Sequence, residues 1–195
     1  KNQLVAVMHL VIYAGFIIIN LEVLEIVLDG IFGTHRLFFP YLGSFYTFLI
    51  NFFEILAVGV IIVCVLFLSR RNILKLKRFI SKDLNGWPRS DANYILIVEI
   101  ILMSFFLTMN ATDRALQLQG SEQYHNTGSF VFSGLLAPLF STLSTTTLVG
   151  IERTCWWIHI VGILAFLNYL PYSKHLHIIL AFPNAYYARL PLLGK

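Results

Sequence analysis

The histidines are the residues of this sequence whose type and spacing could do chemistry: His9, His35, His125, His159, His175 and His177. Neutral imidazole is a good axial ligand for haem iron, and helical bundles build cofactor sites from side chains on facing helices. His159 and His177 are 18 residues apart, which is a whole number of helical turns. In a straight helix they share one face, about 27 Å apart. This spacing predicts two binding sites for a cofactor, one near each end of the helix.

Two cofactor sites of this kind would each need a pair of haem ligands. His9 and His177 lie at matching ends of the first and last apolar segments, so we expect them to bind a b-type haem near the inner surface. Histidines that reach from a helix end toward lipid headgroups are the alternative. For a second, outer haem we expect His159 with His35, which follows a glycine-containing turn at residues 30–36. His125 lies on a long loop, where we expect it to be solvated.

The composition decides the class of protein that holds these histidines. Of the 195 residues, 57% are hydrophobic and 12% are charged, against about 45–50% and about 25% in soluble domains. A water-soluble domain of this size is therefore excluded. The two cysteines, Cys64 and Cys155, form no Cys-x-x-Cys motif, which excludes a disulfide framework and a cysteine-ligated zinc or iron–sulfur site within this chain.

Four segments are long and apolar enough to cross a bilayer, for which about 20 residues in a helix are needed. They cover about residues 4–29, 42–68, 92–112 and 149–172. Since backbone groups cannot stay unpaired in lipid, these runs must be helical. The sequence thus predicts an all-α membrane protein, with residues 1–195 as a single four-helix, haem-binding domain. The first residue is Lys1 and no clear domain end follows, so we expect a fragment of a longer polypeptide.

The distribution of basic residues predicts the orientation. Seven lie between the second and third segments and four more near the two termini, whereas the other side has three: Arg36, Arg114 and Arg153. By the positive-inside rule, both termini and the second loop are cytoplasmic. We expect a multi-pass protein of the bacterial inner membrane. The net charge of +4 reflects this orientation and indicates no nucleic-acid partner.

Two loops are predicted to be more than connectors. Residues 72–80 carry apolar side chains at helical spacing with basic residues opposite, which is typical of an amphipathic helix on the inner leaflet. It would bind membrane lipid or dock a soluble partner. Residues 113–148 include an apolar stretch at 130–143 that Gly134 and Pro138 interrupt. It is too short to span the bilayer, and we expect it to cap the outer face.

Carboxylates in the outer half of the bundle have two interpretations. Glu22 and Glu25 lie in the first segment and Glu54 in the second. They could pair with the outer arginines and make interhelical hydrogen bonds. Alternatively, they could form a quinone pocket with a proton exit, because quinol oxidation needs groups that accept protons. Glu99, in the inner half of the third segment, could serve an inner quinone site or contact the second loop.

Two stretches of the sequence resemble known membrane subunits. Trp157-Ile158-His159 followed by PYSKHLH at residues 171–177 resembles the last transmembrane helix of the respiratory nitrate reductase gamma subunit. That family has two histidines 18 apart, with a Pro-aromatic-Ser-basic run before the second. The turn at residues 30–36 and the stretch KHLHIILAFPNAYYAR at residues 174–189 look like the membrane domain of bacterial iron–sulfur oxidoreductases related to heterodisulfide reductase. The second resemblance covers nearly the whole chain.

The resemblance implies a cytochrome b-like module that exchanges electrons with quinone. By the gamma-subunit pattern, His9 and His177 match the ligands of the cytoplasm-facing haem, and His159 matches one ligand of the outer haem. The other outer ligand of that family lies ten residues after the His9 position, where this sequence has Ile19. Either His35 substitutes or the outer site is empty, so one or two haems are expected. The closer family carries its iron–sulfur clusters in a cytoplasmic domain that follows in the same polypeptide.

The resulting hypothesis is a haem b module that transfers electrons between quinone and a cytoplasmic iron–sulfur protein or domain, together with other subunits of a respiratory complex. Any bond-making site would lie in that partner. One rival is a cofactor-free subunit that conducts protons or ions through Glu22, Glu25, Glu54 and Glu99. A second rival is a membrane anchor that binds no haem and docks its partners through residues 72–80.

Overall fold

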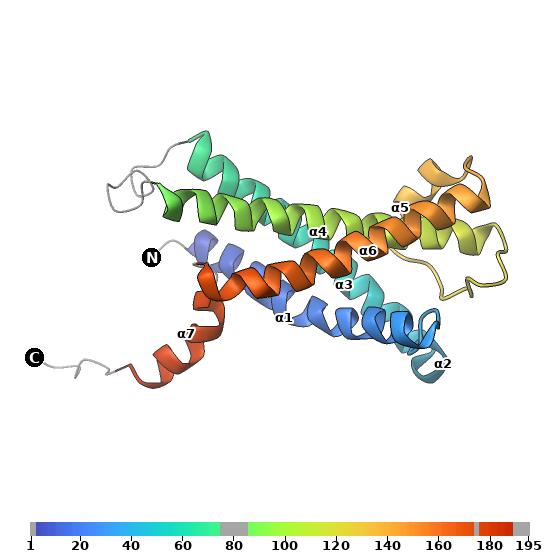
Figure 1. The fold of residues 1–195 in the computed structure, drawn as a ribbon, viewed down its shortest axis with the longest axis horizontal. Coiled ribbons are helices and arrows are strands. Elements are labelled where there is room, and N and C mark those ends of the chain that lie inside the picture. The colour runs from blue at the N-terminus through green and yellow to red at the C-terminus, as the bar shows by residue number, and fades with distance from the viewer. Residues whose placement is uncertain (1–2, 75–85, 174–175, 189–195) are drawn as a thin grey trace, which may run out of the picture.

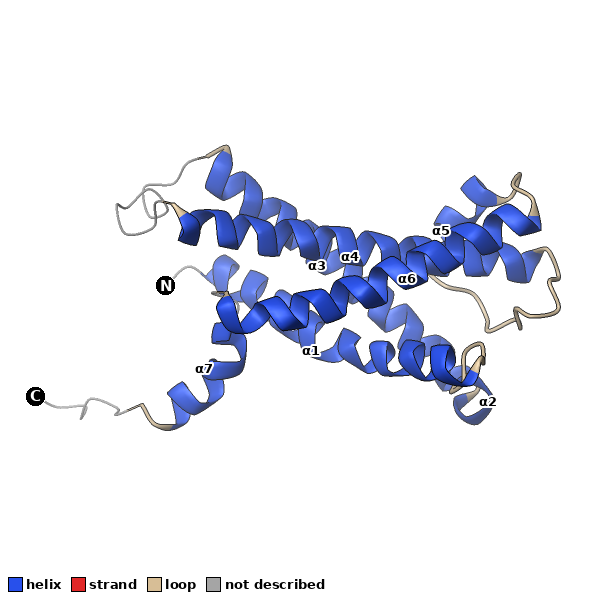
Figure 2. Cartoon of the chain, in the orientation of Figure 1, coloured by secondary structure: helices blue, strands red, loops and turns tan. Residues whose placement is uncertain are grey.

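The computed structural model describes residues 3–74, 86–173 and 176–188, and they form helices and loops without a strand (Figure 2). Four long helices run along the molecule (Figure 1): α1 (Gln3–Phe32), α3 (Ser44–Asn72), α4 (Trp87–Leu118) and α6 (Thr145–Tyr169). The short elements are α2 (Phe39–Leu42), α5 (Phe132–Leu136), η3 (Ala137–Phe140), η4 (Leu170–Tyr172) and α7 (His177–Tyr186). All four long helices have the length and apolarity needed to cross a membrane, which confirms the predicted all-α architecture.

The central helix of the bundle is α4, which packs against both α6 and α3, while α1 packs against α3. The core along these contacts consists of aliphatic and aromatic side chains such as Phe106 and Ile50. We call the end of the bundle that holds His9 and α7 the His9 end (Figure 1). The other end, with α2 and α5 (Figure 1), is the Arg36 end.

Two helix boundaries differ from the sequence-based expectation at the Arg36 end. The third apolar segment was expected to stop at about residue 112, but α4 continues to Leu118. Asp113 is buried in an ion pair with Arg36, so its charge does not end the helix. The last long helix starts at Thr145 because the Ser144 side chain accepts a hydrogen bond from the Thr147 N–H, an N-cap. The capping loop is therefore shorter than the predicted 113–148.

The chain leaves the helical axis between His159 and His177, so the expectation that both share one face of a straight helix is wrong. The α6 helix ends at Tyr169, η4 follows, and Ser173 is extended with φ −105° and ψ 163°. Pro171 has no N–H to continue the helical ladder, and its ring disfavours helical geometry in the residue before it. The α7 helix then starts at His177 and runs off at an angle to α6 (Figure 1).

Several expectations fall outside the described residues. The amphipathic segment predicted at 72–80 lies mostly within 75–85, and His175 lies within 174–175. The same holds for eight of the basic residues that set the predicted orientation: Lys1, Lys75, Lys77, Arg78, Lys82, Lys174, Arg189 and Lys195.

A glycine sets the distance between α1 and α3. A Cβ atom at Gly15 would lie 2.6 Å from Cγ2 of Val60, a β-branched side chain with little freedom to move. Small residues at such positions let membrane helices approach closely, which strengthens their packing.

We predict that Gly15→Ala destabilises the bundle by about 1–3 kcal/mol, the usual cost of overpacking a core. Thermal unfolding in detergent, followed by circular dichroism, measures this. Gly150→Ala is the matched control, because a Cβ at this other helical glycine meets open space. Equal melting temperatures for the two variants would contradict the close approach of α1 and α3.

Candidate functional site

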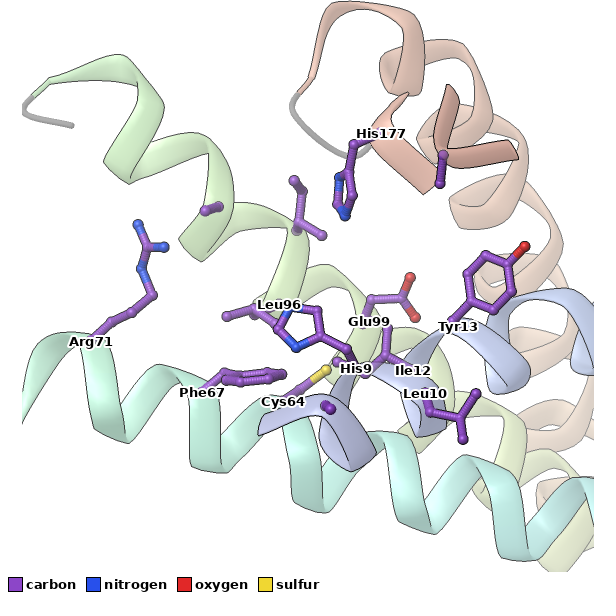
Figure 3. A pocket seen from close by; sticks show the side chains of 14 residues that line it. His9, Leu10, Ile12, Tyr13, Cys64, Phe67, Arg71, Leu96, Glu99 and His177 are labelled. Carbon is purple, nitrogen blue, oxygen red and sulfur yellow. The ribbon is translucent and has the colours of Figure 1, made fainter. Parts of the chain in front are cut away.

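A large cavity lies at the His9 end between α1, α3, α4 and α7, with a volume of about 850 Å³. His9 and His177, from α1 and α7, both line it and point into it (Figure 3). The structure thus places on one cavity the two histidines that the sequence paired. The other lining side chains are mostly apolar: Ala6, Leu10, Ile12, Tyr13, Cys64, Phe67, Arg71, Ala92, Ile95, Leu96, Glu99 and Ala181.

The His9 imidazole is held by its own helix. Its Nδ1–H donates to the Val5 carbonyl at 3.0 Å, one turn earlier in α1, and its ring meets the edge of Phe67 with centroids 5.0 Å apart. Because a carbonyl only accepts, this bond fixes the tautomer and leaves the Nε2 lone pair for a ligand. Metal-binding histidines commonly make this second hydrogen bond, which orients the ring.

The polar groups of the cavity lie at different depths. Arg71 lies in the last turn of α3 and Ala92 near the start of α4, while Glu99 is seven residues beyond Ala92 on α4, about 10 Å further along the helix. The Tyr13 side chain is one turn beyond His9 on the same face of α1. Sequence reasoning missed Tyr13 as a site residue, although its i, i+4 spacing from His9 could have indicated it. In the sequence, Arg71 is one of the seven basic residues between the second and third segments, which predict only the orientation of the chain in the membrane.

The residues of this cavity fit a haem better than a bare metal ion. Two imidazoles on different helices facing an apolar space of this size are what a haem with two axial histidines requires. Zinc sites, by contrast, take three or four protein ligands. Among the residues that the structure describes, no group of three or more His, Cys, Asp or Glu side chains could hold a metal ion. His9 and His177 are the residues that would hold a haem here.

The structure does not bring His159 and His35 together. The buried His159 donates from Nδ1 to the Leu102 carbonyl at 2.9 Å, whereas His35 pairs through Nε2 with Asp113 at 3.1 Å. Both partners are on α4, 11 residues apart, which is about 16 Å along the axis. Two rings this far apart do not share one haem iron in this geometry, which gives no support to His35 as the second ligand opposite His159.

The space beside Ile19 is also small. Ile19 is 4% exposed and belongs to the core, and it borders a cavity of about 40 Å³ between α1, α3, α4 and α6. That volume is suited to water molecules rather than to a cofactor. The His159 Nε2 atom is buried without a hydrogen-bond partner in the described part of the chain.

Arg36 is the centre of a buried polar network at the opposite end. Its guanidinium donates from Nη2 to Asp113 at 2.8 Å and to Asn110 at 2.8 Å, and from Nη1 to the Tyr46 hydroxyl at 3.2 Å. Glu22 lies 3.6 Å from Nη1. Burial lowers the pKa of the guanidinium, but the Tyr46 hydroxyl and the charges of Asp113 and Glu22 raise it well above its usual value. Arg36 is therefore charged.

The outer carboxylates proposed for a quinone or proton pocket are part of this network. Glu25 accepts from the Phe38 N–H at 2.9 Å and from the Tyr46 hydroxyl at 2.6 Å. Glu54 accepts from the N–H groups of Phe132 and Ser133 at 2.9 and 3.2 Å and from the Ser133 hydroxyl. These contacts bind the α1–α2 turn and the start of α5 to the bundle. The geometry favours the structural interpretation for Glu25 and Glu54.

Glu22 differs from the other two carboxylates. It is 2% exposed, and neither of its oxygens has a hydrogen-bond partner among the described residues. Its contact is the ion pair with Arg36, which directs four of its five N–H donors at other side chains. The cavity nearest to this network, lined by Glu25, His35 and Arg36 among others, has about 30 Å³, which is too small for a quinone ring.

We predict that Asp113→Asn destabilises the protein by about 3–5 kcal/mol, because it leaves the Arg36 charge buried without its hydrogen-bonded counter-charge. Thermal unfolding in detergent measures the effect. Glu122→Gln, at an exposed carboxylate of the same end, is the control and should melt like the unmodified protein. Asp113→Asn and Glu122→Gln proteins with the same melting temperature would show that the ion pair does not hold this end together.

The fold and the cavity together define a class of protein: a helical bundle with four helices able to cross a membrane and a large apolar cavity, bordered by two histidines, at one end. Over all 195 residues the chain is 28% identical to the probable iron-sulfur-binding oxidoreductase FadF of Bacillus subtilis (strain 168), and it spans 26% of that relative's length. No family model and no solved structure matches the chain. The similarity supports the predicted relation to iron–sulfur oxidoreductases, whereas the cytochrome b part of that resemblance stays a prediction.

Proposed function

We propose that this chain is the electron-transfer module of a membrane oxidoreductase, with one b-type haem bound between His9 and His177. The observation that carries the proposal is the cavity of about 850 Å³ onto which two helices far apart in sequence each bring a histidine. The relative is named as iron-sulfur-binding, and its greater length leaves room for the cluster-binding part outside the region that this chain matches. The haem module would exchange electrons with such an iron–sulfur unit and with quinone in the membrane.

The chain's own residues would hold and insulate the cofactor. Haem iron with two imidazole ligands supplies reversible one-electron transfer. His9 offers Nε2 because its Nδ1–H is bonded to Val5, and the apolar walls from α1, α3 and α4 would surround the cofactor with a medium of low dielectric constant. Arg71, in the last turn of α3, places a guanidinium on the cavity, where it would pair with the carboxylates that a haem carries.

The orientation follows from the same proposal. The His9 end would face the cytoplasm, as the basic residues of the second loop and the termini indicate, and would meet the iron–sulfur unit there. In a bacterial inner membrane, quinone would reach the bundle from the lipid that surrounds the four long helices. The rival hypotheses of an ion-conducting subunit or a haem-free anchor leave the histidine-bordered cavity without a role.

We predict that the purified chain contains one haem b. A reduced-minus-oxidised spectrum in detergent should show a low-spin b-type signal, and a pyridine haemochrome assay gives the stoichiometry. His9→Ala and His177→Ala should each lose the low-spin signal, because one axial ligand is removed. His159→Gln should retain it, since His159 donates to Leu102 and does not border the cavity.

Circular dichroism of the same samples separates loss of the haem from loss of the fold. A folded but colourless wild-type protein would refute the proposal and favour the ion-conducting or anchor hypothesis. A second haem that disappears in His159→Gln would show that the outer haem site is also occupied.

A further inference from the structure

Glu99 is an acidic side chain of the large cavity at the His9 end, which we call the inner cavity. It belongs neither to the pair His9 and His177 nor to the buried network at the Arg36 end. It comes from α4 and lines the large cavity at the His9 end (Figure 3). It also lines an adjoining cavity of about 40 Å³. It is 7% exposed. Unlike Glu25 and Glu54, it has no hydrogen bond to any residue that the structure describes. A buried carboxylate that binds no structural partner is expensive and is retained at functional positions.

We propose that Glu99 is a proton-binding site coupled to the electron in the inner cavity: its carboxylate takes up one proton when the cavity gains one electron, and releases it when the electron leaves. This inference rests on the proposed function, because it needs a one-electron cofactor between His9 and His177. The electron comes from quinol or from the iron–sulfur unit, and the proton comes from bulk water.

The physical reason is charge repulsion in a medium of low dielectric constant. An electron added to the cavity brings a negative charge close to the Glu99 carboxylate, and interactions between such charges are strong where water is excluded. A nearby like charge disfavours the ionised carboxylate, so its affinity for a proton rises. By reciprocity, a proton on Glu99 favours the electron.

The other ionisable groups that face the inner cavity are less suited to taking up and releasing this proton. From α1 they are His9 and Tyr13, from α3 Cys64 and Arg71, and from α7 His177. The imidazoles would use their lone pairs on the iron, and arginine stays protonated at all relevant pH values. Tyrosine and thiol groups are ordinarily neutral near pH 7. The side chains that α6 contributes to the smaller cavity, Ile163, Phe166 and Leu167, are apolar.

The test is the pH dependence of the reduction potential of the purified chain, measured by spectroscopic redox titration. In the unmodified protein the potential should fall as pH rises, because deprotonated Glu99 opposes the electron, with a limit of about 59 mV per tenfold change in proton concentration. Glu99→Gln imitates the protonated acid, so its potential should stay at the low-pH value of the unmodified protein. Glu99→Asp should restore the slope, and Glu122→Gln should leave it unchanged.

A Glu99→Gln protein with the slope of the unmodified protein overturns the proposal, since the remaining dependence would then belong to the haem's own carboxylates. A second measurement needs no variant: reduction of the unmodified protein in weakly buffered detergent should withdraw protons, as a pH indicator reports. Absence of proton uptake also overturns the proposal. A colourless protein refutes the haem site itself, whereas a haem-containing protein with a pH-independent potential refutes only the role of Glu99.

Discussion

The burial of one positive charge determines how the Arg36 end of the bundle is built. A guanidinium removed from water must have its donors satisfied and its charge balanced, and Arg36 meets both needs with side chains from α1, α3 and α4. Its backbone has φ of 57°, an unfavourable value for a residue with a side chain. The contacts of the side chain hold it there. The turn between α1 and α2 is consequently fixed against α4.

This network gives the two ends of the bundle opposite properties. At the Arg36 end, Glu25 and Glu54 are used in hydrogen bonds that fix loops, and the remaining space is small. At the His9 end, the helices leave a large apolar space bordered by imidazoles. The structure therefore separates a rigid polar end from an end with room for a ligand, and the proposed chemistry belongs to the second.

The long helices could be predicted from the sequence because hydropathy over some 20 residues is a strong signal that does not depend on tertiary contacts. Their ends could not. The sequence predicts a loop from Asp113, because the neighbouring residues do not show that Arg36, 77 residues earlier, neutralises Asp113 within the helix. The turn at residues 170–173, which separates α6 from the helix that carries His177, likewise depends on how the chain folds. The same limit applies to the site: His9 and His177 could be paired from their positions, whereas the pairing of His35 with Asp113 needed the fold.

The bend after α6 also determines when the cavity is completed. A chain is synthesised from its N-terminus, so α1, α3 and α4, which form three of the walls, are made before α7. His177 is the first residue of α7 and therefore reaches the cavity after the His9 side is in place. During biogenesis the cavity therefore passes through a stage in which the wall formed by α7 is missing.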